Sequence, residues 1–333
     1  MVIKEMPSAK PITSASTKTS PAWTWSRNDL ICALLLTTIV ATLVYFYGFA
    51  HLFIKGIFIS GPCSVAAWAW QAWTPSANQE HSKLVPFISL ALVWYHRKEI
   101  KNAAKRGSNK GLIFIVIGIA FFLLGARCVQ PRLALGSLPF LIYGSVFYLW
   151  GAAVARIVLF PCAFLIFLIP FGAIEQATFR LQFIITGVVG FLSNLVGIKI
   201  DAVGTTLTAA DSSFNFLIAE GCSGVRSIAA MAMISAIYVH LTQDKLWKKI
   251  AIFAFSIVFA IIGNIGRIFT VVLVAKFINP TWASGIYHDY SGYVFFPIAL
   301  LAMLAFSKLI NLNWRQWFEK KRYLERDDVK YDY

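Results

Sequence analysis

Long runs of apolar residues, separated by short basic stretches, constrain this chain more than any other feature. The run Leu30–Tyr47 is long enough for a helix, rising about 1.5 Å per residue, to span a hydrocarbon core about 30 Å thick. No small-residue cleavage site follows it, which argues against a removed signal peptide. Hydrophobic residues make up 58% of the chain and charged residues only 14%, which excludes an ordinary soluble domain. Seven further runs are expected to span: Leu84–Tyr95, Gly111–Ala126, Leu133–Trp150, Ile157–Pro170, Ser223–Leu241, Ile250–Ala275 and Tyr293–Ile310.

The charged residues predict how these helices are oriented. The 30 Lys and Arg residues outnumber the 15 Asp and Glu residues, for a formal net charge of +15. They are bunched between the apolar runs and form no stripe with interleaved aromatic residues, so they indicate membrane topology and no nucleic-acid partner. Basic residues in short loops stay on the cytoplasmic side. Three basic clusters are therefore expected in the cytoplasm, at 97–110, 245–249 and 320–326.

These three clusters share one side only if one apolar run does not cross. We assign this exception to Phe183–Ile198, because Gly187, Gly190, Ser193 and Asn194 interrupt its apolar sequence. Irregular backbone is tolerated at membrane depth only where protein or water covers it. This segment is therefore expected to lie against the outer face or to re-enter it.

The resulting fold class is an all-α polytopic integral membrane protein with about eight transmembrane helices and both ends in the cytoplasm. The outer connection Lys199–Glu220 alternates partially between apolar and polar residues and is expected to hold a short hairpin. The chain divides into a disordered cytoplasmic arm over 1–28, a transmembrane domain over 29–311 and a basic cytoplasmic tail over 312–333. The tail is expected to contact anionic membrane lipids.

The stretch Glu220–Ser227, with the sequence EGCSGVRS, places Cys222 between glycines at the expected outer start of a membrane helix. A helix N-terminus favours the thiolate form of a cysteine, and Arg226, four residues on, shares its helix face and favours it further. Ser223 is a supporting polar residue beside the thiol. The pattern is typical of a nucleophilic cysteine. The alternative is a small buried cysteine, with Arg226 as an interface anchor.

Arg267 lies inside a strongly apolar run, where a guanidinium is costly enough to indicate function. A helix that starts at the cytoplasmic Lys249 carries Arg267 about 25 Å across the membrane, into the outer leaflet and to the level of Cys222. Asn264 lies one turn earlier on the same helix. The alternative is an arginine whose side chain extends to the outer headgroups. In that case Asn264 serves only to hold neighbouring helices together.

His288 and Asp289 fall in the outer loop before the last expected span. A neutral imidazole there serves as a general base or acid, and Asp289 is placed to orient it. Three residue types suited to acyl transfer thus reach one membrane face by an argument that used only loop charges. His81 and Glu80 are also on the outer side, where they either line a substrate entrance or are simply solvated.

The sequence shows no cofactor site and no metal site. The remaining cysteines lack the paired spacing that a metal ion requires, so structural burial is the expectation for them. These cysteines are Cys32, Cys63, Cys128 and Cys162.

Three motifs together resemble the exosortase and archaeosortase family of membrane transpeptidases. Glu220–Ser227 is similar to the family's cysteine box, Asn264–Arg267 to its arginine box, and His288 with Ser291 and Gly292 to its histidine box. The order and spacing agree, and weaker similarities extend the match from about Glu80 to Phe296. Gly221 stands where the family more often has Ala.

The resemblance implies a Cys222, Arg267 and His288 triad that acts through a thioacyl intermediate. It also implies a prokaryotic cytoplasmic (inner) membrane location, with the active site facing outside. The implied partners are exported proteins with a C-terminal sorting signal. That signal consists of a short motif, often Pro-Glu-Pro, then a membrane helix and a basic cluster.

Two other functions stay open on the residues alone. In a polytopic transporter, Arg267 and His288 would line a substrate path and Cys222 would be incidental. In a lipid-linked acyl or glycosyl transferase, His288 would be the base and loss of Cys222 would be mild. It is also open whether Arg226 or Arg267 lies nearer the sulfur.

Overall fold

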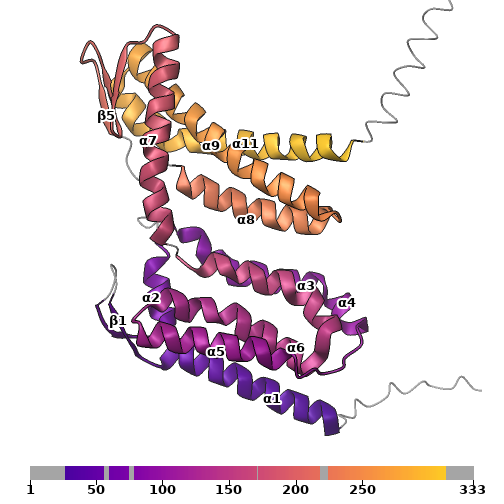
Figure 1. Ribbon diagram of the computed structural model, residues 1–333. Helices are drawn as coiled ribbons and strands as arrows, with labels where there is room; N and C mark the ends of the chain where they lie inside the picture. Colours follow the sequence, from indigo (N-terminus) through magenta and orange to yellow (C-terminus); the bar gives the residue numbers. More distant parts are fainter. Residues whose placement is uncertain (1–26, 56–59, 75–78, 171, 218–223, 313–333) are drawn as a thin grey trace, which may run out of the picture. The chain divides into compact units, whose positions relative to one another are not determined.

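The computed structural model describes residues 27–55, 60–74, 79–170, 172–217 and 224–312 (Figure 1). The expected arm over 1–28 and the expected tail over 312–333 therefore fall almost entirely outside the described residues. The chain divides into two compact units, Met1–Leu43 and Val44–Tyr333. The first unit contributes most of α1 (Arg27–Val44), in which Thr37, Thr38 and Thr42 each donate to the carbonyl four residues earlier. These bonds satisfy hydroxyl groups that lipid cannot.

The second unit is mostly helical, in line with the expected fold class. Its helices are α2 (Val65–Ala72), α3 (Val85–Tyr95), α4 (Arg97–Asn102), α5 (Gly111–Arg127), α6 (Pro131–Phe164), α7 (Gly172–Leu195), α8 (Val225–Thr242), α9 (Leu246–Phe277), α10 (Pro280–Trp282) and α11 (His288–Asn311). Single turns of other helix types are η1 (Tyr45–Phe49), η3 (Glu80–Leu84), η4 (Leu165–Leu168) and η6 (Ala283–Tyr287). Two antiparallel sheets complete it, β1 (Leu52–Lys55) with β2 (Ser60–Cys63), and β3 (Ile200–Val203), β4 (Thr206–Ala209) and β5 (Asn215–Leu217) in that order.

Four helical stretches among the described residues are long and apolar enough to cross a membrane. They are Pro131–Leu168, Val225–Thr242, Leu246–Phe277 and Pro280–Asn311. Shorter apolar helices cover Ala33–Phe49, Gly111–Arg127 and Phe179–Leu195. The chain is therefore a helical membrane protein. The count of eight spans and the orientation stay predictions.

The stretch Pro131–Leu168 is a hairpin of two antiparallel halves. Gly151 interrupts α6 with φ 81° and ψ −174°, a conformation essentially confined to glycine. A Cβ on Gly136 would lie 3.2 Å from Cδ1 of Ile169, so the return half packs against the first half. The two halves match the separately expected spans Leu133–Trp150 and Ile157–Pro170.

Glycines bring α5 and α6 into close contact. Gly111, Gly118 and Gly125 repeat every seven residues on α5, and a Cβ on any of them would come within 2.7 Å of an α6 atom. Small residues allow such approach between membrane helices, where packing and not the hydrophobic effect drives association.

Hydrogen bonds and apolar packing join α8, α9 and α11. Met231, Ile252 and Met303, one from each helix, lie in a common buried cluster. The Ser256 hydroxyl donates to Ser235 across 2.9 Å, and so connects α9 with α8.

The expectation of an interrupted segment at Phe183–Ile198 is wrong, because α7 is a continuous helix from Gly172 to Leu195. Glycine costs a helix only about 1 kcal/mol relative to alanine, and packing outweighs this cost. Gly190 is needed for contact, since a Cβ there would lie 2.8 Å from Cβ of Ala202. Asn194 marks the helix end, because its amide donates to the Ile200 carbonyl (3.0 Å) and accepts from the Ile200 amide (2.9 Å).

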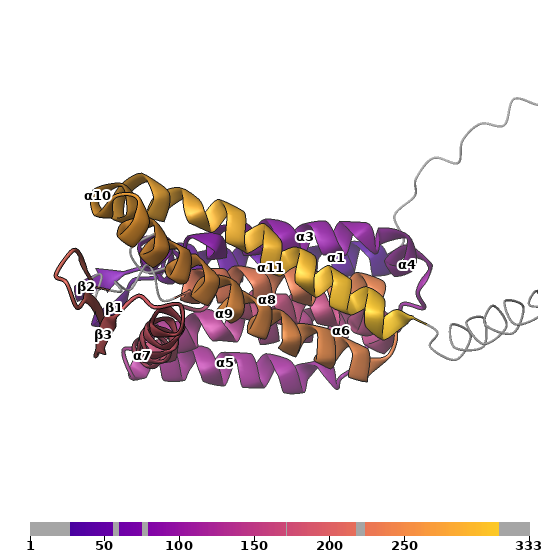
Figure 2. The ribbon, with the colours of Figure 1, turned by 90° about the horizontal axis from the view of Figure 1, so that it is seen from above.

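The direction of α7 differs from that of the long apolar helices that follow it, and its failure to cross the membrane stays a prediction. Figures 1 and 2 both show α7 running across the direction of α8, α9 and α11. The expected hairpin is also present in the following connection, extended by a third strand, with Lys276 of α9 paired to Asp211. Hydrogen bonds from Lys276 and Ser213 hold the pKa of the Asp211 carboxyl well below its usual range.

Gly151→Ala is expected to destabilise the protein by at least about 2 kcal/mol, because the backbone conformation is strained for alanine. The new Cβ would also lie 1.7 Å from the Arg106 carbonyl oxygen. Gly187→Ala is the matched control, since nothing lies within 4 Å of its Cβ position. Thermal unfolding of the detergent-solubilised variants measures both. Equal midpoints would contradict this account of the α6 hairpin.

Candidate functional site

The described chain resumes after residue 223 with a left-handed Gly224, at the start of α8. Gly224 has φ 77° and ψ −1°, and a Cβ there would lie 2.7 Å from Nδ2 of Asn264. Asn264 is buried, with 3% of its surface exposed. The α8 start is therefore packed directly on α9, one turn before Arg267. Cys222 and Ser223 lie outside the described residues.

Arg267 joins α9 to the first turn of α11. Its Nε donates to the Ser291 hydroxyl across 3.1 Å, and one terminal nitrogen, Nη2, donates to the His288 carbonyl across 3.0 Å. The Ser291 hydroxyl in turn donates to the same carbonyl across 2.9 Å. The guanidinium is thus held by a closed set of hydrogen bonds, as a charge at membrane depth requires.

The reversal that brings His288 to Arg267 is encoded locally. Asn279 caps α10, accepting from the amides of Thr281 (2.8 Å) and Trp282 (3.1 Å), and Pro280 fits the first helical position. Gly285 then breaks the helical path with φ −96° and ψ −108°. These residues return the chain along α9, so that α11 begins at His288.

The two ring nitrogens of His288 face different groups. Nε2 lies 3.4 Å from Nη2 of Arg267, and Nδ1 lies 3.2 Å from Oδ1 of Asp289. Arginine has no acceptor, so this arrangement fits the tautomer with its proton on Nδ1, directed to Asp289. The Nε2 lone pair then faces the guanidinium.

Arg226 contacts the segment before α3, where the entrance was expected. Its Nε lies 3.5 Å from Oε1 of Glu80, and the two side chains are 45% and 40% exposed. Burial lowers the pKa of His81; the carboxylate of Glu80 opposes this shift and the charge of Arg226 adds to it. His81 is therefore favoured in its neutral form beside the ion pair.

The predicted site residues thus form two groups connected through the start of α8. Arg267, His288 and Asp289 form one group, and Glu80 and Arg226, with His81, form the other. A small cavity lined by residues of α8, α9 and α11, among them Asn264 and Arg267, has a volume of about 10 Å³, room for at most one water molecule. Among the described residues, no cluster of three His, Cys, Asp or Glu side chains suits a metal ion.

Two serines take part in positioning the site although sequence reasoning assigned neither of them a role: Ser291, named only as part of the histidine box, and Ser82. Ser291 is 3% exposed and holds Arg267, and its signal was the spacing of three residues from His288. Ser82 is fully buried beside His81, and its hydroxyl donates to the Phe167 carbonyl of η4 across 2.8 Å. No local pattern identifies the partner of Ser82, because the contact joins distant segments.

The fold and the site define a class of protein: a polytopic helical membrane protein that holds an arginine–histidine pair between two apolar helices. The model of the transmembrane exosortase family (Exosortase_EpsH) matches residues 70–305, which include every described residue of both groups. The chain belongs to the transmembrane exosortase family, and the resemblance found in its motifs is confirmed. No curated protein and no solved structure matches the chain.

Gly224→Ala is expected to destabilise the protein more than Gly197→Ala. Both residues have positive φ and incur similar backbone strain, about 1 kcal/mol, but nothing lies within 4 Å of the Cβ position of Gly197. The additional loss of stability in Gly224→Ala arises from the collision of the new Cβ with Asn264. Thermal unfolding in the wild-type and Asn264→Ala backgrounds checks this, since truncating the amide removes most of the collision. If Gly224→Ala loses the same additional stability in the Asn264→Ala background, the proposed packing is contradicted.

Proposed function

We propose that the protein is a membrane-embedded cysteine protease and transpeptidase. It cleaves the C-terminal sorting signals of exported proteins and transfers the cleaved proteins to an acceptor. The observation that carries this proposal is the junction of three family motifs. Arg267 contacts His288 and Ser291, while Gly224 of the cysteine box packs on Asn264, one turn before Arg267. Membership of the exosortase family supports the same reaction class.

Covalent connectivity supports Cys222 as the nucleophile. Cys222 precedes Gly224 by two residues, and two residues of chain span at most about 7 Å. This short connection supports the proposal that Cys222 acts beside the corner where Gly224 meets Asn264. Removal of its proton by His288 gives the thiolate, the nucleophilic form.

The proposed reaction has two acyl-transfer steps. The Cys222 thiolate attacks the scissile carbonyl carbon, forming a sulfur–carbon bond and a tetrahedral oxyanion. Collapse breaks the carbon–nitrogen bond, and His288 returns the thiol proton to the leaving amine. The acceptor, deprotonated by His288, then attacks the thioacyl carbon and releases the thiolate. Asp289 holds the imidazole through Nδ1 during both steps.

Arg267 suits the oxyanion better than Arg226 does. Its planar fork is fixed by Ser291 and the His288 carbonyl, and Nη1 makes no hydrogen bond to the described residues. A positioned donor that requires no reorganisation is the kind that stabilises developing charge. Arg226 is half exposed and pairs with Glu80, an arrangement that suits alignment of an incoming peptide.

The proposed substrates carry a short motif, a membrane helix and a basic cluster, and are processed at the outer face of a prokaryotic inner membrane. Apolar helices that contain the site, and the basic loops that predict its orientation, support this placement.

Cys222→Ala is expected to abolish processing, whereas Cys128→Ala, at an exposed cysteine, keeps it. The gel mobility of one tagged candidate substrate in membrane fractions of cells that carry each variant measures this. Equal cleavage in both, at matched protein levels, would contradict the thioacyl mechanism. Transport would then be indicated if His288→Ala also has no effect on cleavage, and a lipid-linked transferase if His288 is essential.

Arg267→Ala is expected to lower the cleavage rate about 100-fold or more, the usual effect of losing an oxyanion donor. Arg226→Ala should cost less than about tenfold, because an exposed ion pair contributes little. Arg156→Ala, at an exposed position of α6, is the control. Initial cleavage rates and the yield of captured substrate–enzyme adduct rank the three variants. A greater loss for Arg226→Ala would exchange the roles of the two arginines.

A further inference from the structure

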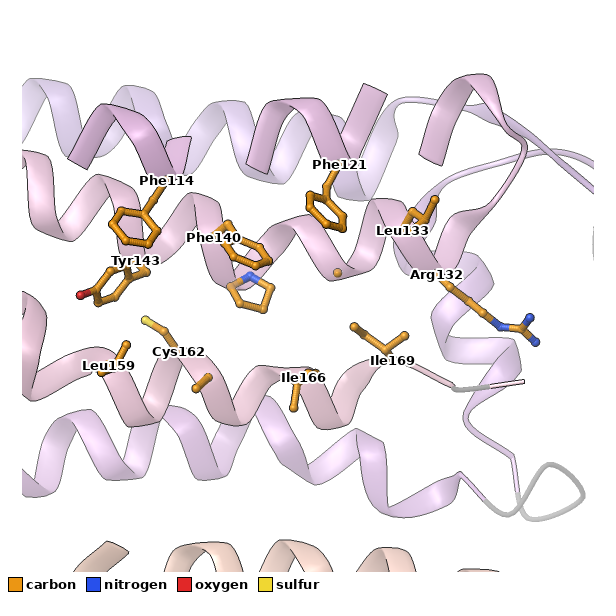
Figure 3. Close-up of a pocket in the computed structure, with 13 residues that line it drawn as sticks. Phe114, Phe121, Arg132, Leu133, Phe140, Tyr143, Leu159, Cys162, Ile166 and Ile169 are labelled. Atoms are coloured by element: carbon orange, nitrogen blue, oxygen red, sulfur yellow. The ribbon is translucent and has the colours of Figure 1, made fainter. Parts of the chain in front are cut away.

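An apolar pocket with a volume of about 590 Å³ lies between α5 and the two halves of α6 (Figure 3). This volume is within the usual range of small-ligand sites, about 300 to 1,000 Å³. Aromatic and aliphatic side chains form most of the lining, and among the described residues that line it Arg132 is the one with a charge. The lining comes from α5 through Phe114, and from the two halves of α6 through Tyr143 and Leu159.

The pocket opens on a surface that an apolar phase must cover. Three of its lining residues, Phe121, Leu159 and Ile166, are 37%, 51% and 49% exposed. They belong to an apolar helix and to a stretch long enough to cross a membrane. Water does not occupy a cavity lined in this way, and an empty cavity forfeits dispersion contacts. A hydrocarbon chain supplies those contacts.

Arg132 marks one end of the pocket as polar. It is the second residue of α6, so it lies at the end of a stretch long enough to cross a membrane, where we expect lipid headgroups. Its Nε is buried and has no hydrogen-bond partner among the residues that the structure describes. Figure 3 shows its guanidinium directed away from the aromatic rings. A phosphate at this end would provide the charge and the acceptor that Arg132 lacks.

We propose that this pocket binds one acyl chain of an anionic membrane phospholipid, with the phosphate at Arg132. The chain fills the space between the halves of α6, and the guanidinium selects the headgroup. A whole substrate helix does not fit, since a helix about 10 Å wide and 30 Å long occupies roughly four times this volume. The proposal concerns lipid binding alone and does not depend on the proposed peptidase reaction.

Photolabelling of the full-length protein tests this proposal. The protein is reconstituted in phosphatidylcholine vesicles with a trace of phosphatidylglycerol that carries a diazirine on one acyl chain. After irradiation, labelled peptides are mapped by mass spectrometry. Arg132→Gln removes the headgroup contact, with Arg127→Gln as its control at an exposed arginine of α5. Ala163→Phe fills the pocket from an exposed position, with Ala152→Phe as its control on the same helix.

The expected label falls on peptides that contain Tyr143 or Leu159, and excess unlabelled phosphatidylglycerol competes for it better than phosphatidylcholine does. Arg132→Gln and Ala163→Phe should each reduce this label at least fivefold, while both control variants leave it unchanged. Equal labelling of all apolar helices would overturn the proposal, as would equal labelling of the Arg132→Gln and Arg127→Gln proteins. Each variant is first checked for a monodisperse elution profile. If Ala163→Phe fails to fold, the comparison of Arg132→Gln with Arg127→Gln tests the proposal by itself.

Discussion

The need to satisfy one guanidinium between apolar helices determines the geometry of the site. An arginine within a membrane helix costs up to about 2.5 to 3.5 kcal/mol on insertion scales, so the hydrogen bonds of Arg267 offset a substantial part of the cost of folding. Ser291 and the His288 carbonyl provide them. Because both belong to the first turn of α11, the bonds that stabilise the arginine also fix the imidazole beside it. Stability and reactivity therefore depend on the same contacts.

Much of this arrangement follows from sequence patterns that act over one or two turns. Apolar length predicted the helices that became the two halves of α6, α8, α9 and α11, and the depth of Arg267 predicted its association with His288. The expected interruption of α7 failed because helix preferences at Gly187 and Gly190 are weak compared with packing. Gly190 serves the close approach of Ala202, a role that local sequence does not distinguish from helix breaking.

Contacts between distant segments were beyond sequence reasoning. Glu80 and Arg226 were both selected as site residues, yet nothing in their neighbourhoods indicated that they pair. Ser82 has the same property, since its bond to Phe167 depends on how η3 packs against η4. Gly151 is a further case: the separate spans expected on either side of it indicated a reversal, but nothing indicated that a single strained glycine would make it within an otherwise helical stretch. Such features depend on tertiary packing, which overrides local preference.

The way α8 is held bears on how an extended peptide would reach the site. The His240 ring at its far end stacks on Phe160, with ring centroids 3.8 Å apart, and Arg226 in its first turn forms a half-exposed ion pair with Glu80. Exposed pairs contribute at most about 1 kcal/mol, so a substrate carbonyl or carboxylate that competes for Arg226 opens this contact at little cost. Ser291 and Asn264 are buried, so in the proposed reaction we expect Arg267 and His288 to stay fixed while the contact between Glu80 and Arg226 opens.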